Sequence, residues 1–155
     1  LGAGFGAFRI DPISRCVGVH VMELSRRRAI DVWPPLLNLR YGENTGINFG
    51  LFDGGSDAAR RILIGFSLLV CAAVFVWVRR AHPHWRMQAS AGLLIGGALG
   101  NVADRLLYGY VLDFLNMSCC GIDNPFVFNL GDVFIFAGAA GLILFDAGER
   151  RKNAP

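Results

Sequence analysis

Residues 62–78 form an uninterrupted run of apolar, uncharged side chains, and a pair of arginines flanks each end of it. As a helix, this run would extend about 26 Å, close to the roughly 30 Å hydrocarbon thickness of a bilayer. Residues 87–107 and 126–145 are apolar apart from a few polar side chains, and residues 1–24 are a weaker candidate because charged residues and a proline interrupt them. The pattern predicts an all-α membrane protein with four transmembrane helices.

Composition supports this prediction. Hydrophobic residues make up 54% of the 155 residues, and the mean hydropathy is +0.44, which is too apolar for an ordinary soluble domain of this size. The length suits a single integral-membrane domain over residues 1–155. The formal charge is only +3. The basic residues flank apolar runs instead of forming a face with aromatic residues, so no nucleic-acid partner is expected.

Charge distribution predicts the orientation. Four spans place both termini on the same side, and the short basic segments 79–86 and 149–153 assign that side to the cytoplasm. Residues 26–28 are three arginines on the opposite side, where anionic headgroups would attract them. Because the first residue is Leu1 and not methionine, the N-terminus is expected to be incomplete or processed. The first apolar stretch does not have the pattern of a signal peptide.

The segment between the first two spans has a strand-like pattern. Residues 37–41 alternate apolar and polar side chains, and Ile47 and Phe49 continue the alternation after a turn-like stretch at 44–46. A small extracytoplasmic β-sheet element between helices 1 and 2 is therefore predicted.

The cysteines and histidines do not suggest a metal site. Cys71 lies in the middle of a span and is expected to pack there, whereas Cys119 and Cys120 could form a strained vicinal disulfide in an oxidising compartment. His82 and His84 lack a third ligand nearby in the sequence, so we expect no metal ion and no cofactor.

Two aspartates interrupt or end apolar segments. A carboxylate at membrane depth costs roughly 2.5 to 3.5 kcal/mol, so such residues usually face a polar interior and have a function. Asp113 follows the third span, and Asp132 lies three residues after Asn129 at the outer start of the fourth. Both aspartates reach the same membrane level from opposite directions, which predicts a pair of carboxylates sharing one site.

A second polar group lies on the third span. Asn101, Asp104, Arg105 and Tyr108 are spaced so that they share one helix face. We expect Arg105 to neutralise Asp104 locally, and a structural role for that pair is favoured over a catalytic one.

Four sequence blocks, in this order, resemble the signal peptidase II family, the bacterial intramembrane aspartyl proteases that process lipoproteins. The blocks are DPISR at 11–15, ENTGINFG at 43–50, the segment GGALGNVADR through YVLDF at 96–114, and FNLGD at 128–132. Together with the intervening spans they cover nearly the whole chain.

The resemblance implies a specific site. Its catalytic pair corresponds to Asp113 and Asp132, and its supporting polar residues correspond to Asn44, Asn101, Arg105, Asn129, Asp11 and Arg15. Two positions depart from the family pattern. Gly131 stands where alanine is usual, a change between two small residues that we expect to be tolerated. Arg15 stands where lysine is usual, which keeps the charge and changes the shape.

The resemblance also implies the reaction and its location. The expected substrate is a prolipoprotein whose lipobox cysteine carries a diacylglyceryl group, with cleavage just before that cysteine. The enzyme would be a multi-pass protein of the bacterial inner membrane, in contact with lipid and monomeric, with its active site at the extracytoplasmic face.

Two other functions are consistent with part of the pattern. A metal-dependent membrane phosphotransferase could use Asp104, Arg105 and Asp113, although Asp132 would then have no role. A non-enzymatic or catalytically degenerate four-helix membrane protein would leave the pair of aspartates unexplained.

Overall fold

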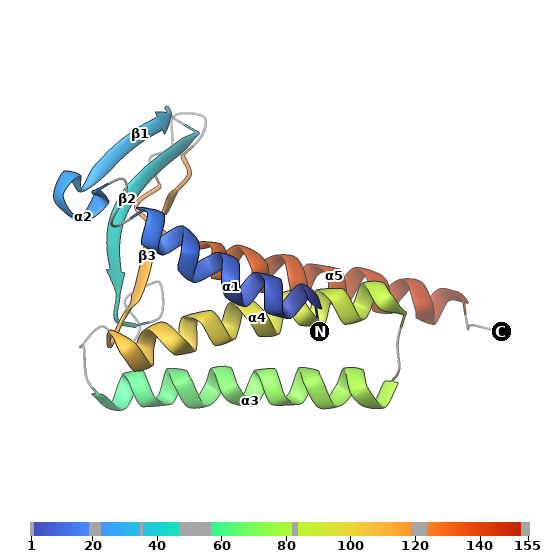
Figure 1. Ribbon diagram of the computed structural model, residues 1–155. Helices are drawn as coiled ribbons and strands as arrows, with labels where there is room; N and C mark the ends of the chain where they lie inside the picture. The colour runs from blue at the N-terminus through green and yellow to red at the C-terminus, as the bar shows by residue number, and fades with distance from the viewer. Residues whose placement is uncertain are drawn as a thin grey trace.

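The computed structural model describes residues 2–18, 23–34, 36–46, 57–81, 84–118 and 124–152, with side chains described up to residue 146. It is mostly helical with one small antiparallel sheet, as predicted (Figure 1). The elements, in chain order, are α1 (Gly2–Cys16), α2 (Leu24–Arg27), β1 (Ala29–Trp33), β2 (Leu37–Asn44), α3 (Asp57–Ala81), α4 (Trp85–Leu107), β3 (Val111–Asn116) and α5 (Leu130–Lys152).

Helix α4 is the centre of the helical part. It packs against α1, α3 and α5, whereas the sheet lies at one end of the helices (Figure 1). The C-terminal ends of α1 and α4 and the N-terminal end of α5 all lie near this sheet. Polar residues on these three helix ends are therefore brought close to one another.

Small residues allow the long helices to approach closely. A Cβ atom added to Gly4 of α1 would lie 2.9 Å from the carbonyl oxygen of Gly92 in α4, and one added to Gly138 of α5 would lie 2.5 Å from that of Ser90. Neither position accommodates a side chain without a shift. Such contacts are typical of helices that pack through backbone proximity in a lipid environment.

The sheet has the strand order β1-β2-β3, with both pairs antiparallel. The strand predicted at 37–41 is confirmed as part of β2, whereas Ile47 and Phe49 lie outside the described residues. We had predicted that the sheet lies between the first two long helices, and this is only partly correct. Its third strand, β3, follows α4, because Gly109 at φ +85° turns the chain and residues 111–116 pair with β2.

Two helix boundaries differ from the predicted spans. The first span was predicted over residues 1–24, but α1 ends at Cys16 and Leu24 begins the separate helix α2 after Glu23, whose φ of +51° is not right-handed helix. The last span was predicted from residue 126, but α5 begins at Leu130. Phe128 is extended there because its backbone pairs with that of Leu115.

Among the helices of the described residues, α3 is the one that is both long enough and apolar enough to cross a membrane by length and composition. It contains the predicted span 62–78, and α4 contains the predicted span 87–107.

Candidate active site

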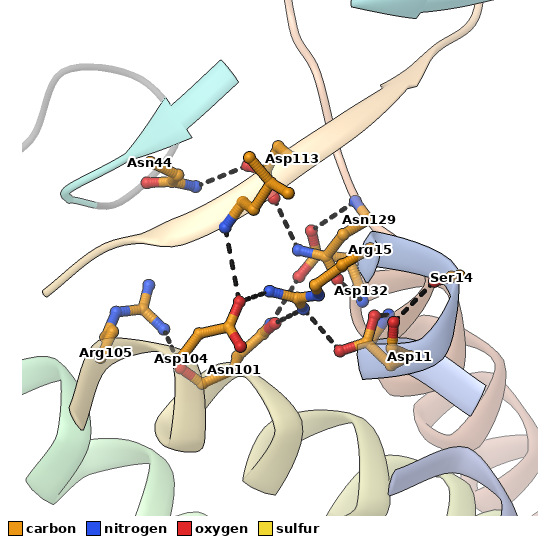
Figure 2. A network of polar contacts seen from close by, with 12 residues as sticks. Asp11, Ser14, Arg15, Asn44, Asn101, Asp104, Arg105, Asp113, Asn129 and Asp132 are labelled. Atoms are coloured by element: carbon orange, nitrogen blue, oxygen red, sulfur yellow. Dashed lines mark hydrogen bonds and ion pairs between the residues drawn. The ribbon is translucent and has the colours of Figure 1, made fainter. Parts of the chain in front are cut away.

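The two aspartates predicted to form a pair come from different kinds of element. Asp113 lies in β3 and is 2% exposed, and Asp132 lies in the first turn of α5. Figure 2 shows both carboxyl groups directed into one polar network, with Asn129 between them. The structure therefore brings the predicted pair into a single site.

Asn129 contacts both aspartates. Its side-chain Nδ2 donates to Asp113 Oδ1 at 2.6 Å, and its Oδ1 accepts from the backbone N–H of Asp132 at 3.0 Å. In return, Asp132 Oδ2 accepts from the backbone N–H of Asn129 at 3.3 Å. This reciprocal pair is a capping box, in which the residue before a helix and the third helical residue satisfy each other's N–H groups. The start of α5 therefore determines where Asp132 lies.

Asn44 holds the other side of Asp113. The antiparallel register of β2 and β3 pairs Asn44 with Val111, two residues from Asp113. Asn44 Nδ2 donates to Asp113 Oδ2 at 3.0 Å, and its Oδ1 accepts from the backbone N–H of Gly46 at 3.2 Å. Since the acceptor end of this amide is already occupied, its donor end is directed to the carboxyl group.

Asn101 of α4 performs the same task for Asp132. Its Nδ2 donates to Asp132 Oδ1 at 2.9 Å, while its Oδ1 accepts from an amino group of the Arg15 guanidinium at 2.7 Å. Arg15 therefore determines which end of the Asn101 amide faces Asp132, although Arg15 itself has no hydrogen bond to that aspartate in the described network.

Arg15 is the centre of a buried ionic cluster. Its guanidinium donates to Asp11 at 2.6 Å and also to Asp104, and Asp11 is fully buried. Asp11 in addition accepts from the backbone N–H of Gly131 at 2.8 Å, which places a carboxylate at the positive end of α5. This cluster joins α1, α4 and α5 next to the aspartate pair.

The expected pairing of Asp104 with Arg105 is wrong. Asp104 pairs with Arg15, whereas Arg105 donates to the backbone carbonyl oxygens of Asn101 at 3.4 Å and of Gly46 at 3.5 Å. Adjacent helical residues point about 100° apart, so Asp104 and Arg105 face different neighbours. The Nε–H of Arg105 is buried and has no acceptor among the described residues.

Gly131 lies where this network is most crowded. A Cβ atom at Gly131 would lie 2.8 Å from Asn129 Oδ1, 3.1 Å from Asn101 Oδ1 and 3.2 Å from Asp11 Oδ2. From residue size alone, we expected glycine and alanine to be interchangeable at position 131. That expectation took no account of the surrounding oxygens or of the hydrogen bond from the Gly131 backbone to Asp11. The spacing of these residues does not indicate either feature, because Asp11 is 120 positions from Gly131 and the crowding also depends on how Asn101 of α4 packs against α5.

The environment of Asp113 favours its protonated form. Burial, as the largest cause, raises the pKa of Asp113 to about 6 from an ordinary value of 3.8, and the negative charge of Asp132 acts in the same direction. The hydrogen bonds from Asn129 and Asn44 oppose this rise. The pair is thus able to retain one proton near neutral pH.

Within the part of the chain that the structure describes, no group of three or more His, Cys, Asp and Glu side chains is placed to hold a metal ion. His82, Cys119 and Cys120 lie outside the described residues. The site is a set of carboxyl groups, side-chain amides and guanidinium groups, which is suited to proton transfer and to binding a peptide backbone.

Comparison with known proteins shows which family this chain resembles. The family model described as Signal peptidase (SPase) II matches residues 5–147. The chain is 35% identical to a lipoprotein signal peptidase of Rhodopseudomonas palustris, covering 91% of this chain and 87% of that protein. It is 36% identical to one from Rhizorhabdus wittichii, covering 98% and 90%, and 43% identical to one from Caulobacter vibrioides, covering 76% and 67%.

Solved structures share the fold. A bacterial membrane enzyme determined at 2.3 Å resolution has a TM-score of 0.82 at 23% identity, covering 98% of this chain and 89% of that one. A second bacterial membrane enzyme, determined at 1.9 Å, has a TM-score of 0.76 at 24% identity, covering 92% and 88%. The fold is therefore that of a bacterial membrane enzyme. Together with the family model and the curated relatives, this shows that the chain belongs to the signal peptidase II family.

Proposed function

We propose that the protein is an intramembrane aspartic endopeptidase that removes the signal peptide from diacylglyceryl-modified prolipoproteins, cutting just before the lipidated cysteine. Membership of the signal peptidase II family supports a protease acting on prolipoproteins. The observation that carries the aspartyl assignment is the position of Asn129, whose two side-chain atoms hydrogen-bond Asp113 and the backbone of Asp132 at the same time.

The two carboxyl groups have different surroundings, which suggests different roles. Asp132 is also buried, but it lies at the positive end of the α5 dipole and accepts from a backbone N–H as well as from the Asn101 amide, contacts that stabilise its ionised form against burial. Among the described residues, Asp113 accepts from the neutral amides of Asn44 and Asn129, and burial raises its pKa to about 6. We therefore assign the shared proton to Asp113.

The reaction follows from this assignment. Asp132 removes a proton from a water molecule, whose oxygen attacks the carbonyl carbon of the scissile peptide bond. Asp113 donates its proton to the carbonyl oxygen, so that a neutral tetrahedral intermediate forms. When the carbon–nitrogen bond breaks, Asp132 returns its proton to the departing nitrogen and Asp113 regains the proton of the hydroxyl group. The reaction needs no covalent intermediate and no metal ion.

The remaining polar residues would position the reactants. Asn101 and Asn129 orient the carboxyl groups, and Asp11 and Arg15 orient Asn101 and the start of α5. Arg105 still has a buried Nε–H without an acceptor in the described residues, and its charge lies close enough to interact with both aspartates. It is suited to donate to a backbone carbonyl of the bound peptide.

We further propose that residues 1–155 form one integral-membrane domain with four spans, provided by α1, α3, α4 and α5, that acts as a monomer in the bacterial inner membrane. Both termini would be cytoplasmic and the sheet extracytoplasmic. This arrangement suits the substrate, because the lipid can remain in the outer leaflet while the peptide reaches the aspartates.

Cleavage in the presence of a chelator tests the proposed class. The purified protein is incubated with a diacylglyceryl-modified prolipoprotein and with the unmodified precursor, each with and without EDTA. We expect cleavage of the lipidated form alone, unaffected by EDTA. Loss of cleavage with EDTA would favour metal-dependent hydrolysis over the aspartyl mechanism, and absence of cleavage would favour a non-enzymatic relative or a membrane phosphotransferase.

A further inference from the structure

A groove of about 430 Å³ runs along α4, where α1 and α3 both pack against it (Figure 1). Large apolar side chains from all three helices form its walls: Phe5, Phe8, Phe75, Ile95 and Leu99. The groove is open to the outside, since Phe5 is 66% exposed and Phe75 is 48% exposed. None of the described active-site residues lines it, so the proposed mechanism leaves the groove without a role.

One end of the groove is polar and positively charged. Arg79 and Gln88 line it there, in the last turn of α3 and the first turn of α4. The guanidinium carbon of Arg79 lies 5.9 Å from the centre of the Phe75 ring, so the charge is held against the groove wall. Among the described side chains, no carboxylate lies within ion-pair distance of Arg79. The groove therefore combines an apolar length with an uncompensated positive charge at one end.

The charged end of the groove is remote from the aspartate pair. Figure 1 shows the end of α3 and the start of α4 at the opposite end of the helices from the sheet. Gln88 is thirteen residues before Asn101 in α4, which corresponds to about 20 Å along a helix. In the proposed topology this end lies at the cytoplasmic surface, where Arg80 and Arg86 add further positive charge. A ligand whose head is held at Arg79 is therefore separate from a peptide bound at the aspartates.

The chemistry of the groove favours a ligand with an apolar chain and one negative group. An acyl chain fills the hollow between the walls through van der Waals contacts. A phosphate at the charged end accepts hydrogen bonds from guanidinium and amide N–H groups, which Arg79 and Gln88 provide. Basic pockets between helices on the cytoplasmic side of a membrane are typical sites for anionic lipid headgroups. A zwitterionic lipid carries its own positive charge and gains less from Arg79.

The same charge disfavours a signal peptide as the occupant. Signal peptides begin with a positively charged segment, and a signal peptide that spans the membrane places this segment at the cytoplasmic surface, beside Arg79. Repulsion between like charges opposes that placement. A phospholipid of the cytoplasmic leaflet has a negative charge at the same depth, so its headgroup is complementary to this end of the groove.

We propose that the groove binds an anionic phospholipid of the cytoplasmic leaflet, with its phosphate at Arg79 and Gln88 and an acyl chain along Phe8, Phe75 and Ile95. The bound lipid fills the hollow between α1 and α3 and stabilises the packing of both helices on α4. This inference goes beyond the proposed function, because the lipid is a component of the bilayer and not a substrate, and its binding requires no cleavage.

Photo-crosslinking of the purified protein in detergent tests the site. The probe is phosphatidylglycerol with a diazirine in one acyl chain. We expect saturable labelling of residues 5–8, 75–79 and 91–99. Unlabelled phosphatidylglycerol should compete roughly fivefold better than phosphatidylcholine with the same chains, as one arginine at a headgroup provides. Labelling spread evenly over α3 and α5, or equal competition by the two lipids, would overturn the proposal. Displacement of the label by a synthetic signal peptide would assign the groove to the substrate instead.

Removal of the charge tests the headgroup contact. Arg79→Gln should abolish the preference for phosphatidylglycerol, whereas Arg79→Lys keeps the charge and should retain most of it. Arg61→Gln is the matched control, because Arg61 is an exposed arginine near the other end of α3, and it should leave the preference unchanged. Phosphatidylglycerol should also raise the thermal midpoint of the wild type more than phosphatidylcholine does, and this difference should disappear in Arg79→Gln. An unchanged preference in Arg79→Gln would exclude Arg79 as the headgroup site.

Obstruction of the groove tests the position of the acyl chain. Leu99→Trp should reduce saturable labelling several-fold, whereas Phe66→Trp, at a 64% exposed position of α3 outside the groove, should not. Full labelling of Leu99→Trp would contradict the groove as the site. Asp113→Asn should bind the lipid as the wild type does, since the crosslinking needs no turnover. An inactive protein that labels as expected contradicts the peptidase alone, and an active protein without saturable labelling contradicts the lipid site alone.

Discussion

Asn129 and Asp132 cap each other at the start of α5: the Asn129 side chain accepts from the Asp132 backbone at 3.0 Å, and the Asp132 carboxyl group accepts from the Asn129 backbone at 3.3 Å. Asn129 then uses its remaining amide hydrogens on Asp113. The same local contact therefore begins a helix and brings a carboxyl group from a distant strand to its end. Substitutions at these residues should therefore affect both the stability of the fold and the rate of cleavage, and the two effects can be measured separately.

Asp113→Asn and Asp132→Asn should each reduce cleavage by roughly 100- to 10,000-fold, because each role needs an ionisable carboxyl group. Their effects on stability should differ. Asp132→Asn weakens the capping box and should lower the thermal midpoint, whereas Asp113→Asn replaces a carboxyl group that already carries the shared proton and should lower it less. Cleavage of a lipidated precursor and melting in detergent measure the two effects. Asp31→Asn, at an exposed position of β1, serves as the control, and substantial turnover by either active-site variant would contradict the pair.

Stability should fall as the pH rises past the ordinary range of an aspartate. Because burial raises the pKa of Asp113 from 3.8 to about 6, the folded protein binds this proton more tightly than the unfolded chain does. The contribution of this proton to the free energy of unfolding is roughly 3 kcal/mol. It is fully present below pH 3.8 and is lost as the pH rises through about 6. The wild-type melting temperature should decrease over this interval, and the decrease should be smaller in Asp113→Asn. Identical slopes in both proteins would show that Asp113 does not titrate in this way.

Asp104→Asn should affect stability more than chemistry. Asp104 pairs with the buried Arg15 and contacts neither aspartate of the pair in the described network. Weakening a buried ion pair costs several kcal/mol, roughly 3 in similar cases. Asp57→Asn is the matched control, since Asp57 is 72% exposed and its pair with Arg60 should be worth at most about 1 kcal/mol. An Asp104→Asn protein that melts normally yet is inactive would move the catalytic assignment to Asp104.

Gly131→Ala should reduce kcat, in contrast to the expectation from residue size alone. Its methyl carbon would lie 2.8 Å from Asn129 Oδ1, so the amide that joins the two aspartates must move. A small misplacement of catalytic groups costs roughly 10- to 100-fold in rate. Gly65→Ala in α3 is the control, because a Cβ there meets nothing within 4 Å and should slightly stabilise the helix. A Gly131→Ala enzyme with full activity would show that Asn129 relaxes without loss.

The proposed topology can be tested by labelling substituted cysteines in a background without the native ones. A membrane-impermeant reagent should reach a cysteine placed at Ser56 or Asp123 and should fail to reach one at His84 or Asn153, because the densest basic charge lies next to the latter positions. The reverse pattern would place the aspartates at the wrong face for an exported, lipidated substrate and would contradict the peptidase proposal.

Much of the molecule was predictable from the sequence, because its strongest signals are local. The apolar run at 62–78 lies within α3, and the alternation at 37–41 lies within β2. The order of the four sequence blocks led to the family, which the comparisons show. The candidate site residues could also be recognised from the sequence, because each lies in a short polar segment that interrupts apolar sequence.

The sequence determined that this chain has apolar helices, a strand segment and two aspartates next to apolar segments, because hydrophobic periodicity and residue type are properties of short segments. Only the tertiary structure decided the partners. Arg15, and not the adjacent Arg105, neutralises Asp104; β3 joins the sheet; and Gly131 leaves room for the oxygens around it. The physical reason is that hydrogen bonds and ion pairs depend on directions and distances that are set when α1, α4, α5 and the sheet pack together, and no spacing along the chain encodes them.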